Sequence, residues 1–226
     1  MNVMFNQSLK DKFIVKLIVA FILIGTLVSG CQSKTASVQQ QVKIPEPKVL
    51  ELTKIISKIQ FGSCAHQKYP QPLWKTMLAE NPDLYIAAGD NVYASSSADK
   101  PIEQAYKLQS LQPEFALYRS QVPTIATWDD HDYGLNDGGT ENPEKEDAKL
   151  NFLKFWPNDA QAIDPRQGGV YHSFLIGSGK QSVQIILLDT RYFRDALVKS
   201  NNPPYPPGPY VATQNKQTTL LGSTQW

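Results

Sequence analysis

The sequence lacks any large excess of charge of one sign. Its 226 residues include 22 lysines and arginines against 21 aspartates and glutamates, a formal net charge of +1. No basic stripe interrupts this balance, so a surface that binds nucleic acid is not expected. Internal repeats are absent too. The 13 glycines and 16 prolines indicate many loops but are too few for a disordered chain, and a hydrophobic content of 41% fits one globular domain.

Cysteine is scarce as well, and the first of the two cysteines follows an export signal. Lysines at positions 10, 12 and 16 precede an apolar segment, 17–28, and small residues follow it. This pattern predicts a secretory signal peptide over residues 1–30 rather than a spanning helix. The stretch "LVSGC" resembles the lipobox of bacterial lipoproteins, which implies that Cys31 carries lipid. A plain membrane anchor or an ordinary cleaved signal is the alternative.

Residues 31–52 are polar and contain "IPEPK", which breaks any helix, so they are predicted to form a tether. We therefore expect an exported protein, lipid-anchored to a bacterial membrane on its periplasmic or outer face. Gln32, rather than aspartate, follows the cysteine and is compatible with an outer-membrane destination. The folded domain is predicted over residues 53–226.

A lipidated Cys31 leaves Cys64 without a partner for a disulfide within the chain. An unpaired thiol in an oxidising location is a liability unless it is buried or bound. Cys64 is therefore expected to be either a buried structural residue or a ligand, and its neighbours decide between the two.

Strands and helices alternate from residue 53 onward. Apolar patterns predict strands in 54–64, 82–91 and 122–130, and a hairpin over 169–193 that turns at Gly177–Lys180. Helices are predicted in 72–81, in two pieces of 101–120 split by Pro113, and from 144 to 156. The apolar residues expected on the inner faces of the first and last helices are Leu73, Trp74, Met77 and Leu78, and Leu150, Leu153 and Trp156.

Polar side chains gather where the predicted strands end. The strand ends are Gly62-Ser63-Cys64, Gly89-Asp90-Asn91, Trp128-Asp129-Asp130-His131 and Asp189-Thr190-Arg191. In an α/β sheet the ligand crevice lies at the carboxyl ends of the strands, so these residues are expected to meet. A thiol, several carboxylates and an imidazole need a counter-charge to coexist, and one or two metal ions would supply it.

Two of these strand-end residues, Asp129 and Asp130, are adjacent in sequence, and successive side chains of a strand point to opposite faces. If the chain stays extended through Trp128, then Asp129 and Asp130 point to opposite sides. We therefore expect one of them to bind metal and the other to orient a neighbour or cap the loop.

Five motifs in order resemble those of the PhoD-like family, the alkaline phosphatase D-type phosphodiesterases within the calcineurin-like metallophosphoesterases. They are "FGSC" (61–64), "GDNVY" (89–93), "TWDDHDYG" (127–134), "LLDTRYFR" (187–194) and "LGSTQW" (221–226). The resemblance runs from about Ile55 to Trp226. It implies an α/β fold, a calcineurin-like αββα sandwich of which the C-terminal half is missing.

The resemblance also implies roles for particular residues. Metal ligands are Cys64, a soft donor for iron; Asp90, which bridges two metals; and Asp130, which contacts the second. His131 interacts with the scissile phosphate and assists the leaving oxygen, and Arg191 is a candidate phosphate clamp with Asp189 as its orienter. The near-site residues are Asn91, Asp129 and Asp189.

The chemistry implied is hydrolysis of a phosphate monoester or diester by a metal-bound hydroxide at a binuclear site. Cys64 favours iron or zinc at one position, whereas the carboxylates permit calcium or manganese at the other. Histidine side chains ionise near neutral pH, which suits general acid work, and the planar fork of arginine binds two phosphate oxygens at once.

Several other conspicuous residues are expected to have ordinary structural roles. Asp137 is interpreted as a turn residue, and Arg119 and Arg194 as members of surface or near-site ion pairs. The stretch 201–210 is interpreted as a stiff loop. The residues expected in the core or without a special role are Trp74, Trp128, Trp156, His66 and His172.

The chain departs from the family pattern at its end. Family members continue past "LG..QW" through Gly-Asp-x-His segments that supply further histidine ligands, whereas none of the three histidines here follows His172. Two hypotheses therefore stand: a lipid-anchored phosphoesterase of which this is the N-terminal part, or a non-catalytic remnant. The chain by itself is predicted to have little or no activity.

Overall fold

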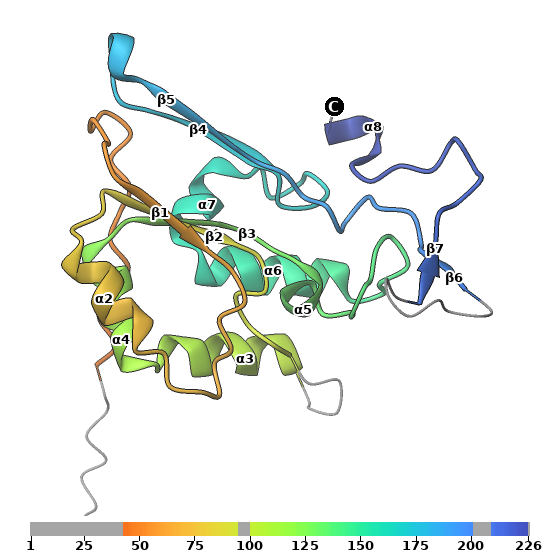
Figure 1. The fold of residues 1–226 in the computed structure, drawn as a ribbon, viewed down its shortest axis with the longest axis horizontal. Coiled ribbons are helices and arrows are strands. Elements are labelled where there is room, and N and C mark those ends of the chain that lie inside the picture. Colours follow the sequence, from red (N-terminus) through yellow and green to blue (C-terminus); the bar gives the residue numbers. More distant parts are fainter. Residues whose placement is uncertain (1–42, 95–99, 201–208, 226) are drawn as a thin grey trace, which may run out of the picture. The chain divides into compact units, whose positions relative to one another are not determined.

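Parallel strands form a central sheet in the part of the chain that the structure describes. This structure, a computed structural model, describes residues 43–94, 100–200 and 209–225. The strands β1 (Ile59–Gly62), β2 (Leu84–Ala88) and β3 (Thr124–Thr127) pair in the order β1-β2-β3. Phe61 lies opposite Ile86, which in turn lies opposite Ile125. The three parallel strands are therefore hardly offset from one another, and their carboxyl ends all lie at one edge of the sheet (Figure 1).

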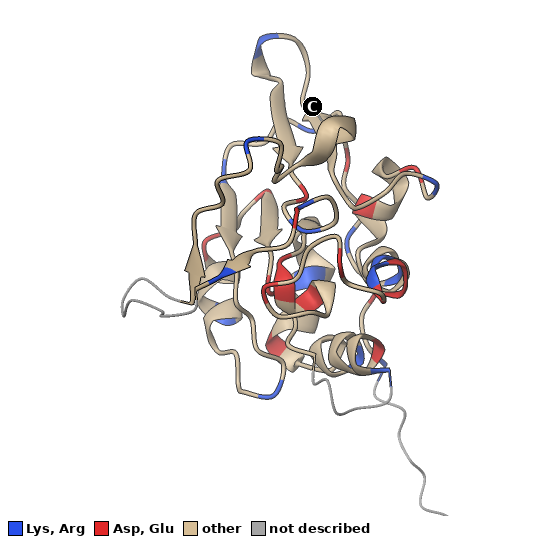
Figure 2. Cartoon of the chain, turned by 90° about the vertical axis from the view of Figure 1, so that its right-hand side faces the viewer, with Lys and Arg blue, Asp and Glu red and all other residues tan. Residues whose placement is uncertain are grey.

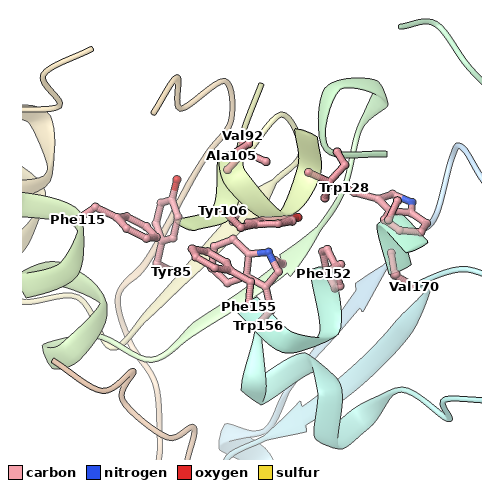
Figure 3. Packing of buried hydrophobic residues seen from close by; sticks show 14 of the residues in the cluster. Tyr85, Val92, Ala105, Tyr106, Phe115, Trp128, Phe152, Phe155, Trp156 and Val170 are labelled. Carbon is pink, nitrogen blue, oxygen red and sulfur yellow. The ribbon is translucent and has the colours of Figure 1, made fainter. Parts of the chain in front are cut away.

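Helices cover one face of this sheet (Figure 1): α2 (Leu73–Ala79), α3 (Pro101–Ser110), α4 (Pro113–Gln121) and α6 (Lys145–Phe155). Prolines in the first turns of α3 and α4 fix where those helices begin. Large aromatic side chains fill the space between helices and sheet, and Figure 3 shows Tyr106, Phe155 and Trp156 packed together there. Rings in such edge and tilted contacts stabilise a core beyond the area they bury.

A hairpin covers the other face of the sheet. It consists of β4 (His172–Ile176) and β5 (Val183–Leu187), joined through the short 3-10 helix η1 (Gly179–Gln181). Phe174 and Ile185 pack inward against Leu84 and Ile125 and form a second core. The outer side of the hairpin is also partly apolar, because Ile186 there is 62% exposed.

Short elements complete the described part of the chain. They are α5 (Asp130–Tyr133), α7 (Pro157–Ala162), β6 (Val198–Lys199), β7 (Tyr210–Val211) and α8 (Gly222–Gln225). Strands β6 and β7 pair with each other in antiparallel fashion. α5 follows β3 almost directly, so its first residues lie at the edge of the sheet where the strands end.

The predicted elements are confirmed, but several of their apolar residues are exposed. In α6, Leu150 is 59% exposed, whereas Leu153 and Trp156 of the same predicted stripe pack in the core. In α2, Leu73 was expected on the inner face and is 65% exposed. In β1, the apolar residue Phe61 is 77% exposed, because the helix-covered face is taken by its neighbour Gln60. The expected burial of Trp74, Trp128 and Trp156 is confirmed.

The predicted tether overlaps the folded region. The amide of Lys48 donates to the carbonyl of Arg119, and the amide of Leu50 donates to the Asn158 side chain. Residues 48–50 therefore belong to the domain, which begins before residue 53. Their backbone amides are fixed by hydrogen bonds to residues of α4 and α7.

Some predicted features lie outside the described residues. These are the signal peptide, the lipidation site Cys31, the tether up to residue 42, the loop 201–208 and Trp226. Within the described ranges, no helix combines the length and the hydropathy needed to cross a bilayer.

Candidate functional site

The loops after β1, β2 and β3 contact one another directly. The amide of Cys64 donates to the carbonyl of Gly89 over 3.2 Å, and the amide of Ala65 donates to that of Asp90 over 3.0 Å. Gly89 has a φ of +104°, and a side chain there would place its Cβ 2.7 Å from the Cβ of Asp129. Only glycine permits this close approach, which brings the loop after β2 against the loop after β3.

Asp90, Asp130 and His131 form the candidate metal centre. One possible ligand atom from each of these three side chains lies within 4.8 Å of the other two. The Cys64 thiol, which is exposed, lies beside them, with Sγ 3.8 Å from Asp90 Oδ2. Acidic segments gather near the middle of the view in Figure 2, which looks toward this side of the domain. The structure thus brings together four of the residues that the sequence indicated.

The electrostatics of this centre fit a bound cation. Burial raises the pKa of Asp90, and the neighbouring carboxylates of Asp130 and Asp129 act in the same direction, against the opposing effect of His131. A positive ion would stabilise the ionised carboxylates. The donors combine hard carboxylate oxygens with an imidazole and a soft thiol, a set that suits a transition metal beside a harder cation.

The chain bends between the two adjacent aspartates. Asp129 is the N-cap of α5 and forms a capping box with Asp132, so the extended strand conformation ends there. Asp130, in the first turn of α5, faces the cluster, and its Oδ2 accepts a hydrogen bond of 2.7 Å from the Asp137 amide. Asp130 therefore lies in the cluster, while Asp129 caps the helix.

Arg191 approaches the cluster from the loop after β5. Its Nε donates to Asp129 Oδ1 over 2.5 Å, and its Nη2 lies 3.7 Å from Asp130 Oδ1. Asp189, which we expected to orient this guanidinium, contacts the backbone instead, because its Oδ1 accepts from the amides of Arg191 and Tyr192. The side chain that orients the guanidinium is Asp129.

The Asp189 backbone is in turn held by the terminal motif. Gln225 Oε1 accepts from the Asp189 amide over 2.7 Å, and Gln225 Nε2 donates to the Asp189 carbonyl over 2.8 Å. The glutamine side chain therefore binds the main chain as a neighbouring strand would. This contact gives the "LGSTQW" stretch a physical role in positioning the loop that bears Arg191.

Asn91 turns away from the cluster and meets a residue that our sequence analysis missed. Its Nδ2 donates to the Thr127 carbonyl over 2.8 Å and to Asp132 Oδ2 over 2.7 Å. Asp132 is completely buried; burial raises its pKa to about 8, against the opposing effect of N–H donors from Asp129 and Asn91. Its spacing of three residues from Asp129 is the capping-box signal that would have found it.

Tyr93 is a second residue that was missed. Its hydroxyl donates to Asp90 Oδ2 over 3.2 Å, and its ring contacts His131 at 4.3 Å between centroids. His66, expected to be ordinary, stacks on the other side of the Tyr93 ring at 4.7 Å. Tyr93 closes the "GDNVY" motif three residues after Asp90, and that position was the available signal. Its phenolic oxygen is a further potential donor to a metal.

The other conspicuous residues lie outside the cluster. Asp137 adopts a left-handed turn conformation, and its carboxylate accepts from the Tyr210 hydroxyl. The expected ion pairs of Arg119 and Arg194 do not form among the described residues. Arg119 lies over the Phe155 ring at 4.1 Å, where burial lowers its pKa to about 10, and Arg194 donates to the Asp137 carbonyl. His172 pairs with buried Asp159.

The parallel strands of this mixed α/β fold thus end in a cluster of carboxylates and an imidazole. The family model for "PhoD-like phosphatase" matches residues 59–226, and the chain belongs to this family.

Two proteins show how much of the architecture is shared. A solved structure entitled "Structure of PhoD" superposes with a TM-score of 0.57 at 21% identity, over 80% of this chain and 39% of that chain. A protein of Arabidopsis thaliana named "Probable inactive purple acid phosphatase 14" is 23% identical over 133 residues, which are 58% of this chain and 29% of that protein. The chain thus spans less than half the length of either protein.

Proposed function

We propose that this chain forms the part of a metal-dependent phosphate-ester hydrolase that contains Asp90, Asp130 and His131. One observation carries the proposal: these three side chains offer ligand atoms within 4.8 Å of one another, and the guanidinium of Arg191 adjoins Asp130. Acidic side chains bind a metal cation, and an adjacent arginine binds the phosphate oxygens. Membership of a phosphatase family supports the same reaction class.

Each residue has a role that follows from its place. When bound, one or two metal ions supply an activated water and offset the charge that develops on the phosphate. Asp90, Asp130 and Cys64 would hold the metal: Asp90 Oδ2 lies 3.8 Å from Cys64 Sγ, and Asp90 Oδ1 accepts from the His131 amide. The thiol would favour iron or zinc, and the carboxylates would permit calcium or manganese.

The two residues proposed as catalytic act on the phosphate itself. As a proton donor rather than a metal ligand, the His131 imidazole would give a proton to the leaving oxygen, and the Tyr93 ring against which it packs limits its orientation. Arg191 binds phosphate oxygens, and Asp129 fixes its guanidinium through Nε. Phosphate monoesters and diesters both satisfy this arrangement.

A second candidate function is non-catalytic metal or phosphate binding. The observation in its favour is the size of the donor set. Within the residues that the structure describes, the one cluster of three or more candidate donors contains Asp90, Asp130 and His131. Cys64 and Tyr93 add two further donors to these three. Two metal ions with complete coordination shells need more protein ligands than these five.

Metal content tests the metal centre that both proposals use, and Asp90→Asn is the variant to compare. We expect the purified full chain to retain about one metal ion per molecule, measured by plasma mass spectrometry, and Asp90→Asn to lose it because the central carboxylate is gone. Asp164→Asn, which removes an exposed carboxylate far from the cluster in sequence, is the matched control and retains the metal.

Turnover of bis(p-nitrophenyl) phosphate then separates a catalyst from a binding protein. Hydrolysis abolished by Asp90→Asn supports the enzyme, and metal without hydrolysis supports the binding protein. A chain that unfolds cooperatively and binds no metal contradicts both proposals.

A further inference from the structure

A pocket of about 400 Å³ opens beside the candidate metal centre, on the side of Cys64. It lies between the loop that follows β1, the helix α2 and the strand β2. Cys64 and His66 line it, and His66 stacks on the Tyr93 ring that contacts His131. The pocket and the metal centre therefore share one wall. A molecule whose phosphate lies at Asp90 has room to extend into this pocket.

The walls of the pocket are mostly apolar, with Ser63, His66 and Gln71 among the polar side chains that line it. Among the described residues, no aspartate, glutamate, lysine or arginine lines it. Trp74 forms part of the wall, and its indole N–H is fixed by Gln71 over 2.6 Å, while Gln71 is bound to Gln109 of α3. Leu73 lies at the same pocket and is 65% exposed. A fixed apolar cavity of this size suits a ring-sized organic group rather than a second phosphate or a sugar.

One polar side chain of the wall, Tyr85, presents its hydroxyl at the pocket. Tyr85 lines the pocket and is 4% exposed, yet its hydroxyl forms no hydrogen bond with any residue that the structure describes. The hydroxyl lies over Gly62, where a Cβ would approach it to 3.0 Å, so the absence of a side chain at Gly62 leaves space beside it. Burial raises the pKa of Tyr85, which keeps the hydroxyl protonated as a donor. A protonated hydroxyl at the wall of a mostly apolar pocket suits an occupant that carries an acceptor.

We propose that this pocket binds the uncharged, ring-bearing organic group of a phosphate ester, and that Tyr85 donates a hydrogen bond to an acceptor on that group. The inference rests on the proposed function, because the phosphate of the same molecule occupies the Asp90 cluster. It goes beyond that function by naming the substrate class: esters of apolar aromatic or similarly sized alcohols rather than of polyols.

Two phosphonates that cannot be hydrolysed test this pocket in calorimetric titrations of the full chain. Methylphosphonate probes the metal centre alone, whereas 4-nitrophenylphosphonate adds a ring and an acceptor. We expect the aryl compound to bind on the order of tenfold more tightly, since it buries a ring in an apolar pocket. Leu73→Gln and Tyr85→Phe each reduce this ratio several-fold and leave the affinity for methylphosphonate unchanged. Leu150→Gln, an exposed leucine on α6, is the matched control and changes neither affinity.

The outcomes separate this inference from the proposed function. Equal affinities for the two phosphonates, with both lost in Asp90→Asn, overturn the pocket and leave the proposed function standing. If the aryl compound binds tightly and neither Leu73→Gln nor Tyr85→Phe weakens this binding, the inference about the pocket is also wrong, because the ring then binds elsewhere. A chain that binds neither phosphonate contradicts the inference and the proposed function together.

Discussion

At the scale of single residues, the contact between His172 and Asp159 joins three elements. The imidazole Nε2 lies 2.8 Å from Asp159 Oδ1, and both side chains are almost completely buried. Asp159 Oδ1 also accepts from the Ala126 amide of β3, while His172 Nδ1 lies 2.7 Å from the Val170 carbonyl. A carbonyl only accepts, so Nδ1 carries a proton. A second proton lies in the contact between Nε2 and the carboxyl group, and burial raises the pKa of Asp159.

Removing the imidazole leaves the carboxyl group of Asp159 buried without its main partner. We expect His172→Ala to lower the free energy of unfolding by about 3 kcal/mol, measured by urea denaturation. In a double-mutant cycle with Asp159→Ala, the two losses do not add, because each variant destroys the same contact. Arg166→Ala, which breaks an exposed ion pair with Asp164, leaves the midpoint unchanged. Strict additivity in the cycle would contradict the role of the pair.

At the scale of elements, α7 covers the free edge of the sheet. β3 pairs with β2 on one side, and on the other its main chain meets side chains from the first turn of α7. Asn158 Nδ2 donates to the Thr124 carbonyl, and Asp159 accepts from the Ala126 amide. Asn158 also binds Lys48 and Leu50 of the segment before β1. The helix thus blocks an edge that would otherwise pair with another chain.

Asn158 is the residue to change in order to test this edge. We expect Asn158→Ala to lower the free energy of unfolding by about 2 kcal/mol, since it leaves the buried main-chain groups of Thr124 and Leu50 without partners. Gln161→Ala, an exposed position on the same helix, is the control and has no comparable effect in the same denaturation experiment. If Asn158→Ala lowers the free energy of unfolding no more than Gln161→Ala does, water replaces the asparagine as the hydrogen-bond partner.

The sequence predicts the order of the elements better than it predicts the contacts between them. The order of strands and helices follows from apolar periodicity and from the prolines of α3 and α4, and the strand ends that meet at Asp90 follow from the topology of a parallel sheet. The partners of Asn91, Arg191 and Asp189 could not be predicted, because they depend on rotamers and on contacts across 36 to 62 residues of sequence. The exposed Phe61 shows the same limit: alternation predicts two faces of a strand but not what covers each.

At the scale of the whole molecule, residues Lys43–Trp226 form one compact unit. We propose that the protein is exported and anchored to a bacterial membrane through lipid on Cys31. The lysines, the apolar run and the small residues before this cysteine support the proposal. An anchored domain would act on substrates at or near that membrane.

Lipid labelling tests the anchor in bacterial cells that express the full chain. We expect the protein to incorporate a labelled fatty acid, and Cys31→Ser to abolish the label and release the protein from the membrane fraction. Cys64→Ser is the matched control, because it removes the other cysteine and keeps the label. A label that persists in Cys31→Ser would contradict the anchor.

The left-handed backbone at the candidate centre also affects how this protein can evolve. Cys64, Asp90 and Asp137 have φ values of 62°, 51° and 52°, in the region that glycine adopts without steric conflict. Glycine at Cys64 would relieve roughly 1 kcal/mol of local conflict but remove the thiol. Selection for heat resistance and selection for metal binding therefore favour different residues at the same positions. A lineage released from the second pressure would drift toward glycine first at the metal centre, and this drift would mark it as inactive.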